Sequence, residues 1–434
     1  MLEAVALSRR IENKLPGIYT FQPENLTREN QVNLSSPVIL PVFTIIENNL
    51  AEHLIFAYQS ETVYMRIAIV INKSWNIYNF RMGLVQTFLQ LGYEVVAIAP
   101  PDEYSPKLEA AGCRYVPIEM ENKGTNPLQD LALTQRFYQV YRQVKPDIIL
   151  QYTIKPNIYG TLAARLAGIP TINNVSGLGT VFIIKNFVSK VALGLYKMAF
   201  RFPAKVFFQN HDDRQLFLAH KLVKAGITDV LPGSGIDISR FKPAPVFTRN
   251  TRFTFLMIAR VLYEKGVVEY VEAARIIRQK YPEVRVQLLG GIDESGNIGI
   301  KHAVFDPWVK EGAIEYLGTS DDVAAHIRAA DAVVLPSYRE GTPKTLLEAA
   351  ALGKPIITTD VPGCKETVTD GENGFLCEVK NAPDLANKMI RLYELAEADL
   401  QRMGQSSRRL AEEKFDERYV IQKYLDAIHA ITKA

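Results

Sequence analysis

The stretch AVVLPSYREGTPKTLLEAAALG, residues 332–353, decides the fold class. It begins with an apolar, β-branched run that predicts a buried strand ending at Pro336, and it closes with a Leu/Ala pattern that predicts a helix. We expect this helix to begin at Pro343, because proline suits the first helical position. A buried strand, a short polar loop and a helix in this order are typical of an α/β fold with a parallel sheet.

The loop and the start of this helix predict a site for an anion that carries adjacent hydroxyl groups. The backbone N–H groups expected to be free, around Lys344 to Leu346, can face an anion at the positive end of the helix. Glu340 lies before the helix and Glu348 lies one to two turns inside it, so both carboxylates can reach a ligand there. A sugar diphosphate with a ribose fits this arrangement. The alternative, which either residue alone would favour, is a capping Glu and a solvated helix Glu.

A second pair of charged residues lies in ARVLYEKG, residues 259–266. Arg260 follows a predicted strand at residues 253–259, and Lys265 precedes a predicted helix at residues 267–280. Parallel α/β sheets bind ligands beyond the carboxyl ends of their strands. Arg offers a planar fork and Lys a point charge, and both suit a diphosphate. The alternative is a pair of solvated loop charges.

Short apolar runs alternate with helical patterns from Met65 onward. Predicted strands of the first half cover residues 66–71, 94–99, 147–150, 171–174 and 206–209. After the Gly-Ser-Gly at residues 233–235 the series restarts, with strands predicted at residues 253–259, 284–289, 332–335, 355–358 and 375–379. Predicted helices include residues 80–91 and 383–397. The alternation predicts right-handed βαβ units, and so two doubly wound Rossmann-like domains facing across a cleft.

This pattern divides the chain into four segments. The two domains are predicted at residues 65–236 and 237–415, because Gly and Pro cluster between them at residues 233–245. Residues 416–434 predict an amphipathic helix that packs back on the first domain. Residues 1–64 hold seven Glu, no Asp and four Lys or Arg, a net charge of −3. We interpret them as an extension without a stable fold, the alternative being an accessory segment.

Composition excludes several classes of protein. The chain has 434 residues, 47% of them hydrophobic and 22% charged, which is ordinary for a globular protein. Fifty Lys and Arg against 47 Asp and Glu do not favour nucleic acid as a partner. Three scattered Cys favour neither a disulfide scaffold nor a zinc site. Each uninterrupted apolar run is shorter than the roughly 18–20 residues that a membrane-spanning helix needs.

Taken together, the R-x4-K-G motif at Arg260 and the stretch LPSYREGTPKTLLEAAALGKPIITTDVPGCKE resemble the retaining nucleotide-sugar glycosyltransferases of family 4, which have the GT-B fold. The resemblance implies that Glu340 contacts the donor sugar, that Glu348 contacts the ribose, and that Arg260 and Lys265 hold the diphosphate and stabilise the leaving group. Arg260, Lys265 and Glu340 are therefore the catalytic candidates. The implied donor-binding set is Arg260, Lys265, Gly318, Glu340, Gly341, Thr342, Pro343, Lys344, Thr345 and Glu348.

The implied co-substrate is a nucleotide sugar, with UDP as the expected nucleotide, and we expect neither a metal ion nor another cofactor. Cationic side chains and the helix start can neutralise the leaving diphosphate, and no DxD pair ends a predicted strand. We interpret Asp321-Asp322 as a helix cap and Asp212-Asp213 as a solvated turn. The sequence offers no convincing protein nucleophile, so front-face attack is expected rather than double displacement.

Three loops of the first half indicate which subgroup of this family the chain resembles. They are KSWNIYNFR at residues 73–81, QYTIKPNIYG at residues 151–160 and NNVSGLGTVF at residues 173–182. They are similar to loops of bacterial enzymes that extend polyprenyl-diphosphate-linked sugars in O-antigen, capsule or N-glycan assembly. Many family members have a His where this chain reads TIKPN. The acceptor-side candidates are Trp75, Asn76, Arg81, Lys155 and Asn157.

Residues 180–210 contain five Lys or Arg and no acidic residue, interleaved with aromatic and aliphatic side chains. A basic amphipathic helix is typical of a protein that binds a membrane surface. The membrane-surface candidates are Lys185, Lys190, Lys197 and Arg201. The alternative is a core helix with a solvated basic face.

With a lipid-linked acceptor, this segment predicts peripheral association with the cytoplasmic face of the membrane. Two other functions remain open: a glycosyltransferase or sugar-phosphate synthase with a soluble acceptor, and a GT-B-like binding protein without turnover.

Overall fold

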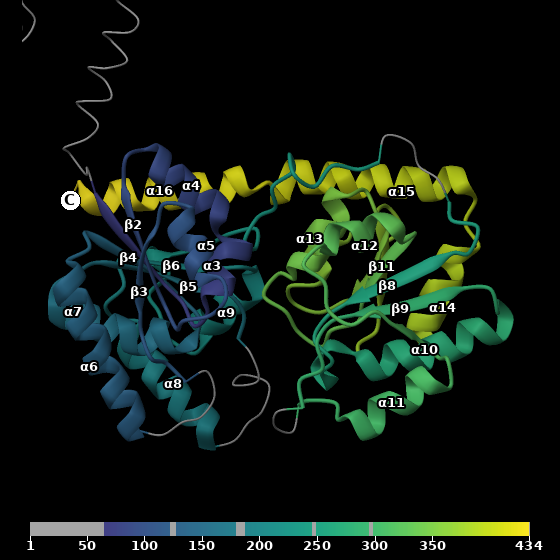
Figure 1. Cartoon of the computed structure of the whole chain (residues 1–434), viewed down its shortest axis with the longest axis horizontal. Helices are drawn as coiled ribbons and strands as arrows, with labels where there is room; N and C mark the ends of the chain where they lie inside the picture. Colours follow the sequence, from purple (N-terminus) through teal and green to yellow (C-terminus); the bar gives the residue numbers. More distant parts are fainter. Residues whose placement is uncertain (1–64, 122–126, 179–186, 245–248, 295–297, 434) are drawn as a thin grey trace, which may run out of the picture. The chain divides into compact units, whose positions relative to one another are not determined.

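The computed structural model describes residues 65–121, 127–178, 187–244, 249–294 and 298–433, which build two parallel sheets (Figure 1). The first sheet has the strand order β3-β2-β1-β4-β5-β6-β7, and the second has the order β10-β9-β8-β11-β12-β13. Counted from its own first strand, each sheet contains the order 3-2-1-4-5-6 of doubly wound nucleotide-binding folds. The first sheet adds one strand, β7, at its edge.

The strands of the first sheet are β1 (Arg66–Val70), β2 (Glu94–Ala99), β3 (Arg114–Pro117), β4 (Ile148–Tyr152), β5 (Thr171–Val175), β6 (Lys205–Phe208) and β7 (Thr228–Val230). The strands of the second are β8 (Thr254–Ile258), β9 (Arg285–Leu289), β10 (Glu315–Tyr316), β11 (Ala332–Leu335), β12 (Ile356–Thr359) and β13 (Gly374–Cys377).

Helices cover both faces of each sheet. Those of the first domain are α3 (Ser74–Phe80), α4 (Met82–Gln90), α5 (Ser105–Ala110), α6 (Pro127–Val144), α7 (Thr161–Ala167), α8 (Phe187–Ala199) and α9 (His211–Ala219). Those of the second are α10 (Val267–Lys280), α11 (His302–Lys310), α12 (Val323–Ala329), α13 (Lys344–Ala351), α14 (Ala382–Tyr393) and α15 (Glu397–Leu410), and α16 (Glu417–Thr432) follows. No helix among the described residues is long and apolar enough to cross a bilayer.

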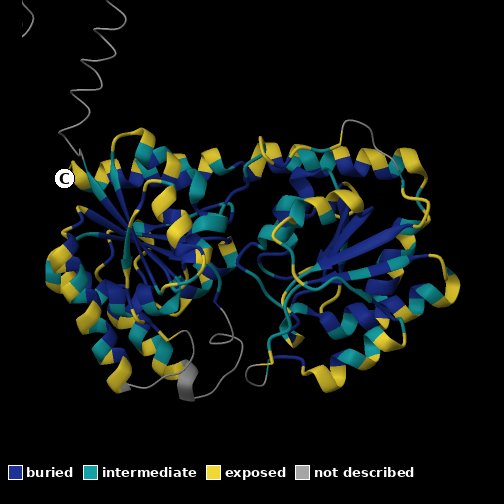
Figure 2. Ribbon diagram, in the orientation of Figure 1, coloured by how far each residue is buried: buried dark blue, intermediate teal, exposed yellow. Residues whose placement is uncertain are grey.

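Burial on both faces explains why the central strands read as continuous apolar runs. In β1, Ile67 and Ile69 join the core cluster that includes residues of α4 and α16, whereas Ala68 and Val70 join the cluster that includes residues of α6 and α7. All four residues are fully buried. Figure 2 shows the same layering, with buried strands between helices that are exposed on their outer sides.

The chain passes between the two sheets twice, and the two crossings touch. The Ile236 N–H donates to the Phe415 carbonyl over 2.8 Å, and the Glu417 N–H donates to the Ile236 carbonyl over 3.0 Å. Gly235 has a φ of +72°, and a Cβ on it would lie 2.5 Å from the Cα of Glu417. The chain then continues into α16, whose Tyr424 belongs to the core of the first sheet. The C-terminal helix therefore packs on the first domain.

Two predicted helices have the wrong extent. The helix predicted at residues 80–91 is split at Arg81, which has a φ of −134°. The Arg81 guanidinium is buried 4.6 Å from the centre of the Tyr152 ring, a contact that the sequence pattern does not show. The helix predicted at residues 383–397 ends at Tyr393, and a new helix begins after Ala396, whose carbonyl accepts the N–H groups of the next turn.

Candidate functional site

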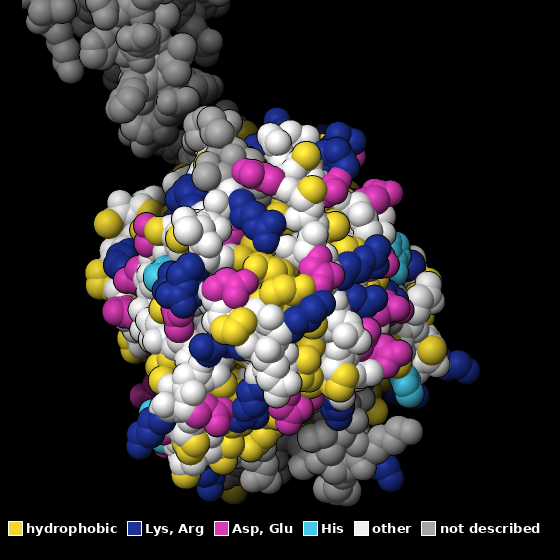
Figure 3. Space-filling view, turned by 90° about the vertical axis from the view of Figure 1, so that its right-hand side faces the viewer, with side chains coloured by type: hydrophobic (Ala, Val, Ile, Leu, Met, Phe, Trp, Pro, Cys, Tyr) yellow, Lys and Arg dark blue, Asp and Glu magenta, His cyan; other side chains and the backbone are white. Residues whose placement is uncertain are grey.

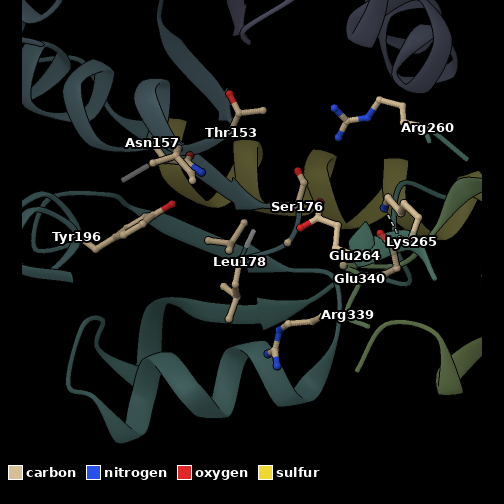
Figure 4. A pocket seen from close by; sticks show the side chains of 14 residues that line it. Thr153, Asn157, Ser176, Leu178, Tyr196, Arg260, Glu264, Lys265, Arg339 and Glu340 are labelled. Carbon is tan, nitrogen blue, oxygen red and sulfur yellow. Dashed lines mark hydrogen bonds and ion pairs between the residues drawn. The ribbon is translucent and has the colours of Figure 1, made fainter. Parts of the chain in front are cut away.

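The candidate site lies where the strand order of each sheet reverses. In the second sheet β8 and β11 are neighbours, and in the first sheet β1 and β4 are neighbours. The loops that leave such a pair diverge to opposite faces, which opens a crevice at the carboxyl ends of the strands. A pocket of about 360 Å³ lies between loops of the two domains (Figure 4). Its lining includes Thr153, Asn157, Ser176, Tyr196, Arg260, Glu264, Lys265, Arg339, Glu340 and Gly341.

Lys265 and Glu340 form an ion pair in this pocket, although 75 residues separate them in sequence. The same carboxylate oxygen, Oε1 of Glu340, accepts a hydrogen bond of 2.8 Å from the Ser337 hydroxyl. Both charged side chains are largely buried, with 19% of Lys265 and 14% of Glu340 exposed. Gly266 has a φ of +72°, and a Cβ there would lie 2.1 Å from the Pro336 carbonyl oxygen. Glycine therefore lets the loops after β8 and β11 approach each other.

Arg260 is the accessible cation of the pocket. Its side chain is 60% exposed, and its Nη1 lies 3.4 Å from Oδ2 of Asp293. Arg260 lines the same pocket as Lys265 and Glu340, and in Figure 4 its guanidinium extends toward the side that Thr153 lines. A screened surface pair of this kind holds its partners weakly, so the guanidinium can turn toward a bound anion.

The start of α13 differs in detail from the prediction. Pro343, with a ψ of 118°, is the N-cap and not the first helical residue. Its carbonyl accepts the N–H of Leu346 over 3.0 Å, so the expectation that Leu346 offers a free N–H is wrong. Lys344 and Thr345 keep the N–H groups that the helix itself does not satisfy. They lie shortly after the loop that carries Glu340, but neither residue is among those that line the pocket.

Glu348 lies inside α13 in a poorly solvated setting and is not among the residues that line the pocket. Burial raises the pKa of its carboxyl to about 7, although Lys344 and Arg240 act in the opposite direction. Burial also lowers the pKa of the Lys344 ammonium, which lies 5.3 Å from the centre of the Phe80 ring in the first domain. A carboxyl group in this setting can bind hydroxyl groups as donor or as acceptor.

Of the remaining donor-side candidates, Gly341 lines the pocket, whereas Gly318, Thr342, Pro343 and Thr345 do not. Gly318 has a φ of +70° and its carbonyl accepts the Gly290 N–H over 2.7 Å. The Thr342 hydroxyl donates to the Gln209 carbonyl over 3.0 Å. The Thr345 hydroxyl lies 3.4 Å from the Ile258 carbonyl. Gly318 and Thr345 hold loops of the second domain, whereas Thr342 joins the two domains.

Of the five acceptor-side candidates, Asn157 lines the pocket and the other four do not. The side-chain amide of Asn157 donates to the Asn174 carbonyl over 2.8 Å. Trp75 keeps 38% of its surface exposed, while the Asn76 amide donates to the Asn72 side chain. Arg81 is packed on Tyr152, and Lys155 is paired with Asp130 over 3.1 Å, so these two serve internal contacts.

Sequence reasoning missed part of the pocket wall. Thr153, Ser176 and Tyr196 line the pocket without having been singled out. Thr153 follows β4 with a φ of +66°, a conformation that costs a β-branched residue energy and that is concentrated at functional sites. A β-branched residue gives no sequence signal for such a conformation.

One pair of acidic residues is placed as predicted and the other is not. The Asp322 side chain accepts the Ala325 N–H over 3.0 Å, so this residue is the predicted helix cap. The expectation of a solvated turn at Asp212-Asp213 is wrong. Asp213 is completely buried at the start of α9 and forms an ion pair with Arg339, whereas Asp212 pairs with Lys365 over 3.0 Å. Partners more than 120 residues away cannot be read from the local pattern.

Two family matches cover most of the described chain. Residues 66–210 match the family described as glycosyl transferase 4-like, and residues 239–410 match the family described as glycosyl transferases group 1. The N,N'-diacetylbacillosaminyl-diphospho-undecaprenol α-1,3-N-acetylgalactosaminyltransferase of Campylobacter jejuni is 32% identical over 85% of this chain and 100% of its own length. The chain therefore belongs to the family of glycosyltransferases that includes the Campylobacter enzyme and that these two matches describe, as its motifs predict. It is a glycosyltransferase.

Further relatives agree with this assignment. An Escherichia coli UDP-Gal:α-D-GlcNAc-diphosphoundecaprenol α-1,3-galactosyltransferase is 26% identical over 62% of this chain and 71% of its own length. Among solved structures, Anabaena HepE in complex with UDP and glucose superimposes with a TM-score of 0.69 at 19% identity, covering 84% of this chain and all of that one. Sucrose-phosphate synthase of Thermosynechococcus elongatus gives 0.70 at 20% identity, over 85% and 99% of the two chains. These structures confirm the predicted fold of two Rossmann-like domains.

Proposed function

We propose that this enzyme transfers an N-acetylated hexose from a UDP-sugar to a polyprenyl-diphosphate-linked saccharide, with retention of the anomeric configuration, in the assembly of a surface polysaccharide or glycan. The observation that carries the proposal is the buried Lys265–Glu340 pair beside the accessible Arg260, in a pocket between the two domains. The names of the Campylobacter and Escherichia relatives support the lipid-linked acceptor and, in the first case, the N-acetylated sugar.

The residues of the site suit the breaking of a bond between a sugar and a diphosphate. As that bond breaks, negative charge grows on the leaving phosphate and positive charge grows on the anomeric carbon. Arg260, Lys265 and the start of α13 can neutralise the phosphate. Glu340, fixed by Lys265 and Ser337, can accept hydrogen bonds from sugar hydroxyls and hold the ring in position.

Retention follows if the acceptor attacks the face that the diphosphate leaves. The acceptor hydroxyl then forms the new C–O bond, and the departing phosphate oxygen takes its proton. This route needs no protein nucleophile and no metal ion, because the cations of the chain compensate the phosphate charge. Transfer should therefore persist in the presence of EDTA.

The exposed face of α8 supports a position at the membrane surface. Exposed residues of this helix recur at positions 190, 191, 194, 197 and 198, and positions 201 and 202 continue the series just beyond it. Lys190, Lys197 and Arg201 thus share one side with the apolar Val191, Met198 and Phe202, while Tyr196 and Phe200 face the core. Such a mixed stripe suits an anionic bilayer. The fourth candidate, Lys185, lies outside the described residues.

Basic and acidic side chains are interspersed on the face of the second domain seen in Figure 3. That mixture contrasts with the basic stripe of α8 and does not suit an anionic bilayer. Because the stripe lies on α8, the first domain is the part that we place against the cytoplasmic face of the membrane.

A donor and acceptor screen tests the proposed function. The full chain is incubated with UDP-N-acetylhexosamines, UDP-hexoses and GDP-sugars, each with synthetic undecaprenyl-diphosphate-linked acetamido sugars or with soluble sugars. We expect a mass increase of one N-acetylhexose on the lipid-linked acceptor and an α-linkage by NMR. Transfer only to soluble sugars, a β-linkage, or UDP-sugar binding without any turnover would contradict the proposal.

A further inference from the structure

The loop that carries Glu340 belongs to the second domain, yet the first domain holds it on both sides of this residue. On the N-terminal side, Arg339 forms an ion pair with Asp213 of α9. On the C-terminal side, the Gly341 carbonyl accepts a hydrogen bond of 2.7 Å from the side-chain amide of Asn210. The same amide lies 3.4 Å from the Glu340 carbonyl. Three consecutive residues of the loop therefore contact two side chains of the other domain.

The Asp213–Arg339 contact is built as a buried ion pair. The Asp213 side chain is completely buried, and 22% of the Arg339 side chain is exposed. Asn210 orients the carboxylate, because its amide lies 3.2 Å from Oδ2 while its own oxygen accepts the Asp213 N–H over 2.7 Å. Figure 4 shows the Arg339 guanidinium extending away from Lys265 and Glu340. A buried charge that loses its partner is strongly unfavourable. The Asp213 carboxylate and the Arg339 guanidinium therefore stay paired in the folded chain.

Gly341 allows the loop to lie directly on the backbone of the first domain. A Cβ at this position would lie 2.2 Å from the Ser176 carbonyl oxygen and 2.7 Å from Oε1 of Gln209. Any side chain would therefore push the loop away from the ends of β5 and β6. The next residue repeats the connection, because the Thr342 hydroxyl donates to the Gln209 carbonyl.

We propose that Asp213 and Asn210 are positioning residues for Glu340, which they hold in its working place by fixing the peptide on either side of it. The proposal rests on the function proposed above, in which Glu340 binds the transferred sugar. It has a consequence for the reaction: Lys265 and Ser337 hold the Glu340 carboxylate within the second domain, but the contacts of the flanking peptides with Asp213 and Asn210 form only when the two domains meet. Loss of the contact should then lower kcat while UDP, whose proposed phosphate site lies in the second domain, is still held.

The neighbouring Asp212 provides a matched control. It lies on the same helix and also pairs across the domains, with Lys365, but its side chain is 42% exposed and its partner is outside the Glu340 loop. Asp213→Asn keeps the shape of the side chain and removes its charge. We expect at least a tenfold decrease in kcat for Asp213→Asn, less than a twofold change for Asp212→Asn, and UDP affinity by calorimetry within threefold of wild type for both.

Hydrogen exchange gives a readout that needs no substrate. Peptides that cover residues 337–342 should exchange at least tenfold faster in Asp213→Asn than in wild type or Asp212→Asn, while peptides of β8 and β11 stay unchanged. Arg339→Ala should give the same loss of kcat, and the double variant should lose no more than either single variant, because both remove one contact.

Equal kcat in the Asp213→Asn and wild-type enzymes, or a double variant whose two losses multiply, would overturn the proposal. Unchanged exchange at residues 337–342 would overturn it as well. If wild type turns over none of the sugar donors while the exchange difference is present, the proposed function has failed and the positioning of the loop has not. If Asp213→Asn unfolds, Asn210→Ser and Gly341→Ala give the same comparison.

Discussion

We expect Glu348 to make the stability of the second domain depend on pH, and Glu348→Gln to remove its part of that dependence. Burial raises the pKa of its carboxyl to about 7 from an ordinary value of 4.5. Between these two pH values the folded chain keeps the proton and the unfolded chain releases it. Stability then decreases as pH rises, because the unfolded state binds fewer protons. Glutamine keeps the size of the side chain but cannot ionise.

The size of the effect follows from the difference in pKa. A shift of 2.5 units at about 1.4 kcal/mol per unit corresponds to about 3 kcal/mol of unfolding free energy. Below pH 4.5 Glu348 is protonated in both the folded and the unfolded chain, so the folded state has its full stability. This part of the unfolding free energy is lost as the pH rises from 4.5 through 7. For a domain of this size, about 3 kcal/mol corresponds to a change in Tm of roughly 6–12 °C.

Scanning calorimetry at pH 5, 6, 7 and 8 measures the effect. We expect the Tm of the transition assigned to the second domain to decrease with pH more steeply in wild type than in Glu348→Gln, so that the two values diverge by roughly 6–12 °C. Glu372→Gln, at an exposed position of the same domain, is the control and should run parallel to wild type. A constant offset between wild type and Glu348→Gln would show that Glu348 is already ionised at pH 5, and the reasoning would be refuted.

Three further predictions concern the site, the membrane and the first residues. Lys265→Ala should lower kcat by about 10²–10³-fold, since it removes a charge that stabilises the leaving group, and it should also lower the Tm, because Glu340 loses its buried partner; kcat within threefold of wild type would contradict this. Lys190→Ala with Lys197→Ala should weaken binding to phosphatidylglycerol vesicles by about 30-fold, at roughly 1 kcal/mol per cation. Lys310→Ala on α11 is its control, and unchanged partitioning would favour an ordinary solvated helix. A chain that begins at Met65 should retain transfer activity and Tm, and loss of either would show that residues 1–64 take part.

Strands whose residues are nearly all buried could be predicted from the sequence, including β13 at one edge of the second sheet, whereas the edge strands β3, β7 and β10 could not. Strands such as β1 and β11 are covered on both faces, so nearly every residue is apolar and the run is conspicuous. At the edges, β3 has exposed or half-buried residues throughout, and β10 is only two residues long. Their positions follow from pairing with β2 and β9, which is information from another part of the chain.

Some residues of the site could likewise be predicted from the local sequence, whereas the roles of others depend on contacts with distant parts of the chain. Lys265 and Glu340 could be predicted because each lies in a loop that directly follows a recognisable strand, and adjacent strands bring such loops together. Lys155 also lies in the loop after a strand, β4, and Arg81 lies between α3 and α4, yet Asp130 and Tyr152 engage them in internal contacts. A loop position indicates that a charged residue is near the crevice. It does not indicate whether another side chain of the protein already pairs with that charge.

Arg260 and Arg339 show how the counter-charge decides the task of a residue. Both line the same pocket from loops of the second sheet. Arg339 meets the buried Asp213, so moving it to a ligand would leave a carboxylate unpaired in the protein interior, which costs several kcal/mol. Arg260 meets Asp293 at an exposed position, where a pair contributes at most about 1 kcal/mol. An incoming diphosphate can therefore recruit Arg260 at small cost, whereas Arg339 is committed to joining the domains.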